Sequence, residues 1–359
     1  MAANRIRVTA PGGDYDILIE SGILSRITQH IDEFSLRGKV VVATNTTLAP
    51  LYGESWVAKL PNASLVVMPD GEQYKTLETV AKLYADFVDA GLDRSGTVIA
   101  LGGGVVGDTV GFAAATYMRG VRFIQIPTTL LAMVDSSVGG KVGVDLPQGK
   151  NLVGAFKQPD LVLIDPDVLQ SLPEREWRCG MAEVVKHGFL ADDELISLAM
   201  SLDPLSVHGE GAGGGVSELV RRAVQVKVDV VQKDPYEKNI RAHLNLGHTF
   251  AHAVEQVSGY SWPHGEAVGV GLVAAARLSH VLNLCDGALS ERVEQIVTKI
   301  GLPTRLNGLD PEALYVAMST DKKWQGGHSR FVLLRGICQP IIVEDVPPEV
   351  VVNVLANLR

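Results

Sequence analysis

The stretch TVIALGGGVVGDTVGFAAATY, residues 97–117, decides the fold class of this chain. Its first five residues, Thr97–Leu101, are apolar and β-branched as in a buried strand, and GDTVGFAAATY has the composition of a helix. A strand, a glycine turn and a helix in this order form the repeating unit of a parallel α/β sheet. Gly102, Gly104 and Gly107 also satisfy the pattern G-x-G-x-x-G, which alone is weak evidence for a dinucleotide site.

The glycine turn has the physical features of an anion site. Glycines let phosphate oxygens approach the backbone, and the start of a helix offers N–H groups and the positive end of its dipole. Two features depart from the dinucleotide fingerprint: the turn does not follow the first strand, and no acid stands cleanly about twenty residues further on. The alternative is a tight turn without a ligand. A Walker A loop is excluded because Lys141 is followed by Val142.

Strand-like and helical patterns alternate through the first half of the chain. The segment Thr76–Ala90 has apolar residues at helical spacing and is closed by Gly91. The strand-like runs are IRVTA, DYDILIE, KVVVAT, SLVVMP, TVIAL, FIQIP and LVLID. Apolar strands that alternate with helices predict a parallel sheet covered on both faces, so residues 1–172 are predicted to form an α/β, Rossmann-like domain.

Helical patterns dominate after about Leu172, and we place a domain boundary near residue 173. The run RFVLLRGICQPIIVEDV near the end predicts a hairpin. Residues 173–359 are therefore predicted to form a mainly α-helical domain. Its predicted helices cover residues 175–190, 216–231, 242–257, 265–282 and 290–300.

Composition excludes several classes of protein. The 359 residues carry a net charge of −9, which argues against a nucleic-acid partner. Cys179, Cys285 and Cys338 are widely spaced and odd in number, which favours a reducing compartment. The start of the chain has no apolar signal region, and the longest apolar run, Ala267–Ala276, is too short to span a bilayer. We expect a cytoplasmic protein with no membrane partner.

Two further polar loops follow predicted strands. They are DGEQYK, residues 70–75, and IPTTLLAMVDSSVGGK, residues 126–141. Ligands of doubly wound sheets lie beyond the carboxyl ends of the strands. Both loops should therefore meet the glycine turn at one edge of the sheet, where an adenine dinucleotide is the natural ligand.

Three histidines stand close together in NLGHTFAHAVEQVSGYSWPHGEAVG, residues 245–269. His248 and His252 lie four residues apart on one helical face, and His264 begins the next helix. This is not the zinc-protease HExxH motif, because Thr249 occupies the position of its glutamate. One such histidine alone would be an interior hydrogen-bonded residue, but three in an apolar pair of helices indicate a metal site.

A catalytic zinc or cobalt site usually has three protein ligands, so a carboxylate could complete this one. The candidates are Glu183, Glu255 and Glu266. Glu183 stands in the apolar helix CGMAEVVKHG, where a carboxylate requires a counter-charge that a metal would supply.

Several basic residues stand beside glycine turns or on apolar helix faces of this acidic chain. They are Lys141, Lys150, Lys186, Lys227, Arg241 and the pair Lys322–Lys323. Each alone could be a snorkelling side chain. Together they indicate a pocket for a substrate with a phosphate or a carboxylate.

These motifs together resemble the 3-dehydroquinate synthase family over nearly the full length of the chain. The matching stretches are DGEQYK, LGGGVVGD, IPTTLLAMVDSSVGGKVGVD, GKNLVGAF, GMAEVVKHG, RAHLNLGHTFAHAVE and HGEAVGVG. The resemblance implies an active site in the cleft between the two domains. It also implies that Glu183, His248 and His264 bind the metal, a zinc or cobalt ion, whereas His252 contacts substrate.

The resemblance assigns the other site residues as well. Arg119 matches a residue that reaches the substrate phosphate of a neighbouring subunit, so a homodimer is implied. The substrate pocket would comprise Asp135, Lys141, Asn151, Lys186, Lys227, Arg241, Asn245, His252 and Lys322 or Lys323. Contacts to NAD would come from Asp70, Gly71, Glu72, Gln73, Tyr74, Lys75, Gly103, Gly104, Val105, Val106, Gly107, Asp108, Thr128, Thr129, Asp135, Lys141, Lys150, Val168, Leu169, Gln170 and Ser171.

The reaction of the family, a carbocycle-forming lyase reaction, would use all of these parts. Its substrate is 3-deoxy-D-arabino-heptulosonate 7-phosphate, and its products are 3-dehydroquinate, on the shikimate pathway to the aromatic amino acids, and phosphate. The steps are transient oxidation at C5 by NAD, elimination of phosphate, re-reduction, ring opening and an intramolecular aldol closure.

Three rival interpretations share parts of this pattern. Metal-dependent alcohol and glycerol dehydrogenases share the two-domain plan but need no phosphate cluster. Another sugar-phosphate cyclase, forming a deoxy-inosose or a valiolone, would differ at the carboxylate-binding residues, where Arg241 and Asn245 keep the dehydroquinate pattern. A nucleotide sensor without chemistry would not need all three metal ligands.

Overall fold

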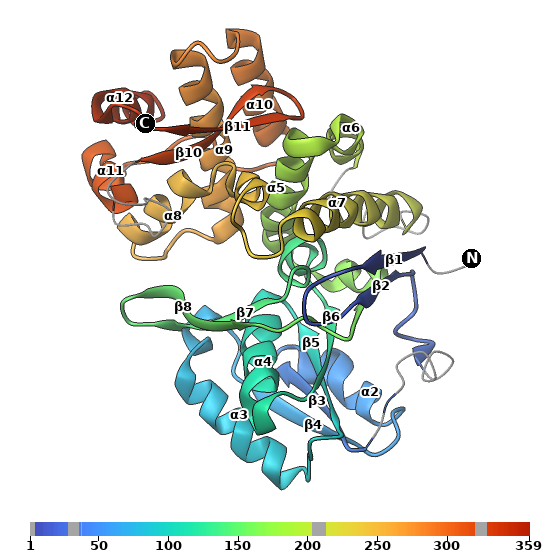
Figure 1. Cartoon of the computed structure of the whole chain (residues 1–359). Coiled ribbons are helices and arrows are strands. Elements are labelled where there is room, and N and C mark those ends of the chain that lie inside the picture. The colour runs from blue at the N-terminus through green and yellow to red at the C-terminus, as the bar shows by residue number, and fades with distance from the viewer. Residues whose placement is uncertain (1–3, 28–35, 37, 203–212, 320–328) are drawn as a thin grey trace. The chain divides into compact units, whose positions relative to one another are not determined.

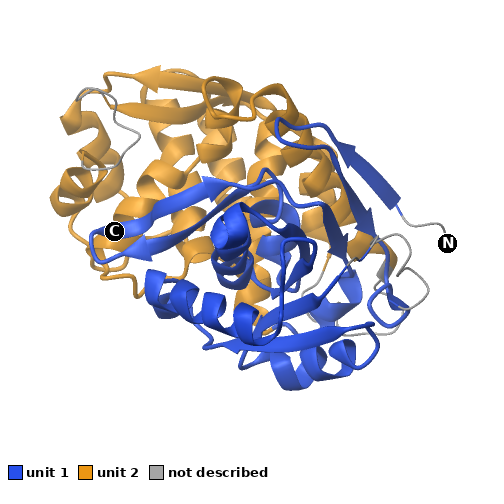
Figure 2. Ribbon diagram, turned by 60° about the horizontal axis from the view of Figure 1, so that its bottom comes forward, with its two compact units in different colours: residues 1–172 blue, residues 173–359 orange. Residues whose placement is uncertain are grey.

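The computed structural model describes residues 4–27, 36, 38–202, 213–319 and 329–359. The chain divides into two compact units, unit 1 with Met1–Leu172 and unit 2 with Pro173–Arg359 (Figure 2). Their folds confirm the predicted class, an α/β Rossmann-like unit followed by a mainly helical one.

Unit 1 is built on a seven-stranded sheet with the order β1-β2-β9-β6-β5-β3-β4 (Figure 1). Its strands are β1 (Asn4–Val8), β2 (Tyr15–Ile19), β3 (Val40–Asn45), β4 (Ala63–Met68), β5 (Thr97–Gly102), β6 (Arg122–Pro127) and β9 (Leu161–Ile164). All neighbours pair in parallel except β1, which is antiparallel to β2 at the edge. The expectation of a parallel sheet was therefore wrong for β1, because the tight turn at Gly12 and Gly13 reverses the chain directly.

The helices of unit 1 follow the strands as the periodicity predicts. They are α2 (Glu54–Val57), α3 (Leu77–Asp89) and α4 (Gly104–Thr116). The Thr76 side chain accepts a hydrogen bond from the Thr79 N–H and caps α3, which ends just before Gly91 at φ +74°. Helix α4 begins three residues earlier than the predicted GDTVGFAAATY helix, because Gly103 is extended and acts as its N-cap.

The core between the sheet and helices α3 and α4 contains Val41, Val98, Phe87 and Val110. A hairpin of β7 (Lys141–Leu146) and β8 (Gly149–Phe156) covers α4 through Val142 and Val144. The sequence analysis did not predict this hairpin, because its glycines interrupt the β-branched runs that indicate strands.

Unit 2 is mainly helical. Its elements are α5 (Glu174–Ala191), α6 (Asp193–Ser201), α7 (Gly213–Lys233), α8 (His248–Val257), α9 (His264–Val281), α10 (Gly287–Lys299), α11 (Pro311–Ser319), α12 (Pro348–Ala356), β10 (Arg330–Gly336) and β11 (Gln339–Glu344). The predicted hairpin is confirmed as the antiparallel pair β10–β11. The predicted helix 242–257 was wrong in its first part: η8 (Ile240–Asn245) is a 3-10 segment, and Gly247 at φ +77° separates it from α8.

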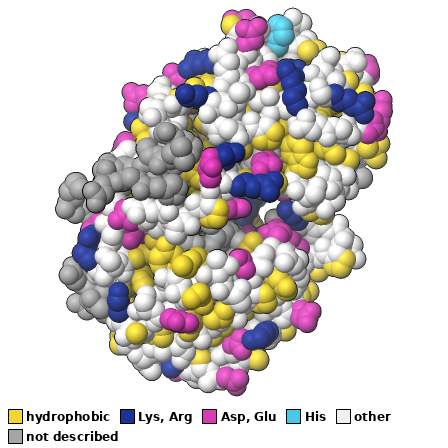
Figure 3. All heavy atoms as spheres, turned by 180° about the vertical axis from the view of Figure 1, so that it is seen from behind, with side chains coloured by type: hydrophobic (Ala, Val, Ile, Leu, Met, Phe, Trp, Pro, Cys, Tyr) yellow, Lys and Arg dark blue, Asp and Glu magenta, His cyan; other side chains and the backbone are white. Residues whose placement is uncertain are grey.

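Charged side chains of both signs lie on the surface of the described residues (Figure 3). On the face shown in Figure 3, Lys and Arg side chains lie among Asp and Glu side chains of the described residues. Within the described part of the chain, no helix is long and apolar enough to cross a membrane.

Candidate active site

Three loops meet at one edge of the unit 1 sheet, as the parallel strand order requires. They follow the carboxyl ends of β4, β5 and β6 (Figure 1). The Thr128 N–H donates to the Gly102 carbonyl over 3.0 Å, and Lys75 Nζ lies 2.7 Å from Asp108 Oδ2 in α4. The DGEQYK loop, the glycine turn and the Thr128–Thr129 turn therefore lie together.

The glycine turn leaves little room for side chains at its own residues. A Cβ on Gly103 would lie 3.0 Å from Thr129 Cγ2, and one on Gly104 would lie 3.3 Å from Ser136 Oγ. Gly107 packs in the same way, because its Cβ would lie 3.0 Å from Gln125 Oε1. The first N–H groups of α4 have no partner within a helix, so this bare backbone is suited to an anion.

The DGEQYK loop begins with a carboxylate held by its neighbours. Asp70 accepts hydrogen bonds from Asn45 Nδ2 at 2.7 Å and from Thr47 Oγ1 at 2.6 Å. Gly71 has φ +118°, and Glu72, Gln73 and Tyr74 follow in the short exposed turn η3 (Glu72–Tyr74). Glu72 Oε1 lies 3.7 Å from Lys150 Nζ on the hairpin.

Lys75 joins this loop to the glycine helix and the hairpin. Its buried Nζ donates to Asp108 Oδ2 at 2.7 Å and to Asn151 Oδ1 at 2.6 Å. Burial alone would lower the pKa of Lys75, but the carboxylates of Asp108, Glu72 and Asp145 together outweigh it and raise that pKa, so the lysine stays charged. Asp145 closes the network: its carboxylate accepts from the Asn151 N–H at 2.7 Å, and its own N–H donates to the Lys75 carbonyl at 2.8 Å.

The remaining predicted residues of unit 1 occupy several elements. The segment η6 (Pro166–Ser171) buries the side chains of Val168 and Leu169, whereas Gln170 and Ser171 are exposed. A cofactor could reach the first two only through their backbone. Asp135 lies in η5 (Ala132–Ser136), and Lys141 is the exposed first residue of β7.

In unit 2, Glu183, His248 and His264 form a cluster. Each offers a ligand atom, and these atoms lie within 4.8 Å of one another. His248 Nε2 is 3.4 Å and His264 Nε2 is 3.6 Å from Glu183 Oε1. His252 lies outside this set, with its ring centroid 5.8 Å from that of His248. The split between His248 and His252 that the resemblance implies is compatible with this geometry.

The hydrogen bonds around the cluster prepare it for a cation. His248 Nδ1 lies 3.1 Å from the Leu246 carbonyl, to which it can donate, and this leaves Nε2, on the side of Glu183, as the nitrogen available to a cation. His264 Nδ1 lies 3.6 Å from the buried Glu255 carboxylate. Desolvation lowers the pKa of His264, but Glu183 and Glu255 outweigh it and raise that pKa to about 9. Positive charge is thus favoured here, and the donor set of two imidazoles and one carboxylate fits zinc or cobalt.

Glycine contacts hold the three helices that carry these ligands. A Cβ on Gly247, just before His248, would lie 2.9 Å from the Leu272 backbone nitrogen. A Cβ on Gly265, just after His264, would lie 2.3 Å from the Cα of Cys179 in α5. These backbone contacts let α8, α9 and α5 approach closely enough for the ligands to meet.

The other two acidic candidates have different surroundings. Glu266 accepts two hydrogen bonds from Arg175, at 2.6 and 3.1 Å, and Glu255 lies on the Nδ1 side of His264. Glu183 is almost fully buried and forms an ion pair with Lys186 of the same helix. The expectation that Glu183 requires a counter-charge agrees with this geometry, although a lysine supplies part of that charge.

The predicted substrate residues Lys227, Arg241 and Asn245 lie on elements that pack against α5, the helix that carries Glu183. Lys227 is buried on α7, and Arg241 is buried in η8. Asn245 Nδ2 donates to Glu237 Oε1 at 2.8 Å, which adds Glu237, a residue that the sequence analysis missed. The sequence could have indicated Glu237, because it is an acidic residue between two predicted basic substrate residues, Lys227 and Arg241. The pair Lys322–Lys323 lies outside the described residues.

Comparisons with known proteins identify the class and then the family. The structure is similar to 2-epi-5-epi-valiolone synthase from Streptomyces hygroscopicus, solved with NAD⁺ and Zn²⁺ bound (TM-score 0.89, 30% identity, 98% of this chain and 99% of that chain). It is also similar to a 2-deoxy-scyllo-inosose synthase complexed with carbaglucose-6-phosphate, NAD⁺ and Co²⁺ (TM-score 0.86, 25% identity, 99% and 100% covered). The fold is thus that of the sugar phosphate cyclases.

Sequence comparison gives the family within that class. Residues 65–179 match the family model "3-dehydroquinate synthase N-terminal", and residues 180–324 match "3-dehydroquinate synthase C-terminal". The 3-dehydroquinate synthase of Microcystis aeruginosa is 45% identical over 356 residues, covering 98% of this chain and 97% of that protein. The chain belongs to the 3-dehydroquinate synthase family of carbocycle-forming lyases, which confirms the predicted resemblance.

Proposed function

We propose that this enzyme converts 3-deoxy-D-arabino-heptulosonate 7-phosphate into 3-dehydroquinate and phosphate, with NAD and one divalent metal ion. The observation that carries the proposal is the convergence of Glu183, His248 and His264 in a chain 45% identical to a 3-dehydroquinate synthase. When bound, the metal supplies Lewis acidity at the C5 oxygen of the substrate, and NAD supplies a reversible hydride acceptor.

Unit 2 would bind the metal and the substrate. Glu183, His248 and His264 would hold zinc or cobalt, with His264 partly exposed so that a coordination position stays open. His252, one helical turn from His248, would exchange a proton with the substrate. The buried cations Lys186, Lys227 and Arg241 would bind the anionic groups, because a buried cation is stabilised by an opposite charge.

Unit 1 would bind NAD at the carboxyl edge of its sheet. The bare backbone of Gly103 and Gly104 and the start of α4 suit the pyrophosphate. Asp70 and the exposed η3 turn lie on the neighbouring loop. The network of Lys75, Asp108 and Asn151 would connect this cofactor loop to the hairpin with Lys141 and Lys150.

We also propose a cytoplasmic homodimer in which Arg119 reaches the substrate of the partner subunit. Met118, Arg119 and Gly120 all have positive φ, at +49°, +65° and +110°, and Arg119 is exposed. Non-glycine residues in this region cost roughly 1–3 kcal/mol each, which is tolerated where function requires the geometry. The three cysteines are unpaired, in agreement with a reducing compartment.

One assay tests the proposed reaction. Metal-loaded protein is mixed with NAD and the heptulosonate phosphate, and inorganic phosphate and NADH absorbance are followed together. Release of phosphate over many turnovers without net NADH supports the proposal, because the hydride is returned within each cycle. Accumulation of NADH without phosphate would make the protein a dehydrogenase.

The likeness to the valiolone and inosose synthases makes another cyclase reaction the second candidate. The two candidate reactions are distinguished when a phosphorylated sugar without a carboxylate is offered in the same assay. Phosphate release from that sugar, and not from the heptulosonate phosphate, would favour the second candidate.

A further inference from the structure

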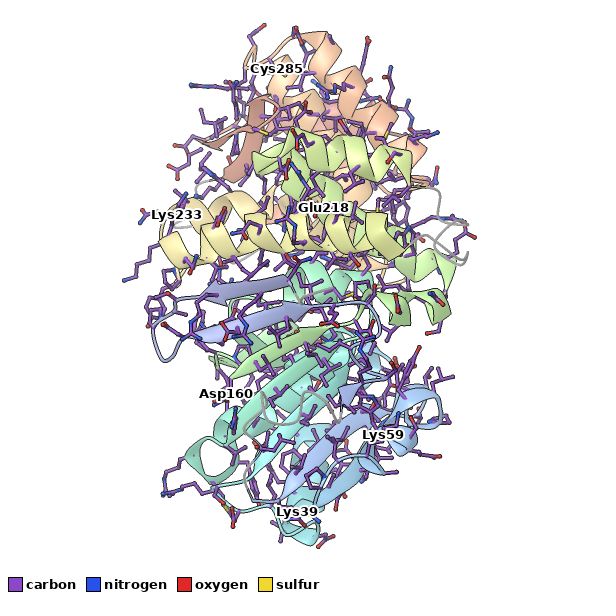
Figure 4. The ribbon with its side chains drawn as sticks, turned by 90° about the vertical axis from the view of Figure 1, so that its right-hand side faces the viewer. Lys39, Lys59, Asp160, Glu218, Lys233 and Cys285 are labelled. Atoms are coloured by element: carbon purple, nitrogen blue, oxygen red, sulfur yellow. The ribbon has the colours of Figure 1, made fainter. Side chains whose placement is uncertain are left out.

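The segment between α7 and α8 carries two predicted substrate residues, Arg241 and Asn245, on the short 3-10 helix η8. It turns sharply after Lys233, which Figure 4 labels at the end of α7. Glu237 has φ +57°, and Asn239 has φ −141° and ψ −104°. A backbone of this shape keeps one conformation only if other groups hold it.

Asp234 is the group that holds it. The residue is 6% exposed and directly follows α7. Its Oδ1 accepts the Lys238 N–H at 2.9 Å, and its Oδ2 accepts the N–H groups of Asn239 at 2.6 Å and Arg241 at 3.1 Å. One carboxylate therefore closes a ring of backbone donors around the turn.

The residues of this turn also orient the side chains of Arg241 and Asn245. Arg241 Nη1 donates to the Pro235 carbonyl at 2.5 Å, and Asn245 Nδ2 donates to Glu237 Oε1 at 2.8 Å. Both acceptors belong to residues between Asp234 and Arg241, the segment that the Asp234 carboxylate holds together. If these backbone hydrogen bonds are lost, the Arg241 guanidinium and the Asn245 amide lose the acceptors that orient them.

The charge state of Asp234 fits this task. Desolvation would raise its pKa, but the N–H groups of Lys238, Asn239 and Arg241 outweigh it and lower that pKa. The group is a carboxylate throughout the neutral range, and both of its oxygens accept.

We propose that Asp234 is a positioning residue that sets Arg241 and Asn245 for the anionic groups of the substrate. The inference rests on the proposed function for the identity of that substrate. Asp234 acts through Arg241 and does not touch the substrate, because both of its oxygens face backbone donors.

The test uses the full-length, metal-loaded enzyme and the variant Asp234→Asn, in which an NH₂ group replaces an acceptor. We expect KM for the heptulosonate phosphate to rise at least about tenfold, because bonds to charged acceptors are the stronger ones, with kcat within about threefold. Affinity for Co²⁺ should stay within about twofold, since none of the three cluster residues lies on this segment. The matched control is Asp286→Asn, a carboxylate that accepts the Leu289 N–H at 3.0 Å and caps α10.

A double-mutant cycle separates positioning from general support. In an Arg241→Lys background, Asp234→Asn should raise KM by less than about threefold, because the group through which it acts is already altered. Equal KM values for Asp234→Asn and Asp286→Asn, or full additivity with Arg241→Lys, would overturn the proposal.

Hydrogen exchange of the substrate-free enzyme gives a readout that does not depend on the reaction. Amides 238–241 should exchange at least about tenfold faster in Asp234→Asn, while α5 and α8 stay unchanged. Faster exchange throughout unit 2 would mean that Asp234 only supports the fold, and unchanged exchange at 238–241 would also overturn the inference. If the wild type releases no phosphate, the proposed function fails, and exchange alone decides whether Asp234 holds the turn.

Discussion

Two carboxylates, each beside a buried lysine, have different surroundings in the two units. In unit 1, Asp108 accepts from Lys75, and Lys75 also bonds Asn151, so donors and acceptors are matched. In unit 2, Glu183 faces Lys186 and also two imidazoles, whose nitrogens lie 3.4 and 3.6 Å from its Oε1. The first arrangement links structural elements, whereas the second brings three potential metal-ligand atoms within 4.8 Å of one another.

The difference shows how a structural ion pair can be told from a ligand site. A matched pair needs nothing further, and breaking it mainly costs stability. Carboxylate and imidazole lone pairs that face one another repel unless a proton or a metal ion lies between them. The raised pKa of His264 shows that this site favours a bound positive charge. Substitutions in the two regions should therefore affect different measurements.

The largest effect is expected for Glu183→Gln. Loss of an anionic ligand should lower phosphate release at least about 10³-fold, since a Lewis acid contributes several kcal/mol to the transition state. Bound metal is measured by chelator competition, with Glu176→Gln, an exposed acid of the same helix, as control. Retention of metal and activity in Glu183→Gln would show that the cluster is not the metal site.

Lys75→Met is expected to cost stability. Removing one partner of a largely buried pair costs up to about 3–5 kcal/mol, because Asp108 loses the cation that compensates its charge. The free energy of unfolding of unit 1 is measured in urea, and the control Lys82→Met removes an exposed pair with Asp86, worth roughly 0.3–0.5 kcal/mol. If Lys75→Met and Lys82→Met lower the free energy of unfolding by the same amount, the Lys75 network contributes no more than an exposed ion pair.

Gly265→Ala should affect stability and metal binding together. Its Cβ would lie 2.3 Å from the backbone of Cys179, so α9 must shift away from α5 and displace His264. We expect a loss of about 1–3 kcal/mol from overpacking and a roughly tenfold weaker metal affinity. The control Gly214→Ala meets no atom within 4 Å and should be neutral or stabilising. If Gly265→Ala is destabilised but binds Co²⁺ with unchanged affinity, the contact between α9 and α5 does not position His264 for the metal.

The smallest effect concerns pH. In the metal-free enzyme the pKa of His264 is raised to about 9, above its ordinary value, so the stabilisation from its charge is complete below about pH 6.5 and is lost as pH rises through 9. Metal must displace this proton, and affinity should rise about tenfold per pH unit, or 1.4 kcal/mol, between pH 7 and 8. Calorimetry of Co²⁺ binding in buffers of different ionisation enthalpy measures the released proton. A pH-independent affinity with no proton release would contradict the assignment.

Much of the fold followed from local patterns, and the errors have local causes. Helix α3 was predicted because the apolar spacing and Gly91 both lie within the segment, and the structure adds Thr76 as its N-cap. The break at Gly247 was missed, since the glycine is required by the backbone of α9, which is distant in sequence. The hairpin β7–β8 was missed for a similar reason: Gly143 and Gly154 pack backbone to backbone, which no pattern in either strand records.

The sequence by itself determined the fold class, the family and the types of residue at the site, because motifs such as LGGGVVGD and HTFAH keep their spacing along the chain. The family resemblance implied that Glu183, His248 and His264 belong together, and the tertiary structure gave the distances between them. Only the tertiary structure decided that Glu255 lies beside Nδ1 of His264 and that Asp234 accepts hydrogen bonds from the turn that carries Arg241. These relations depend on helix approach and on hydrogen bonds between residues distant in sequence. Such distances are set by packing, which the order of residues along the chain does not express.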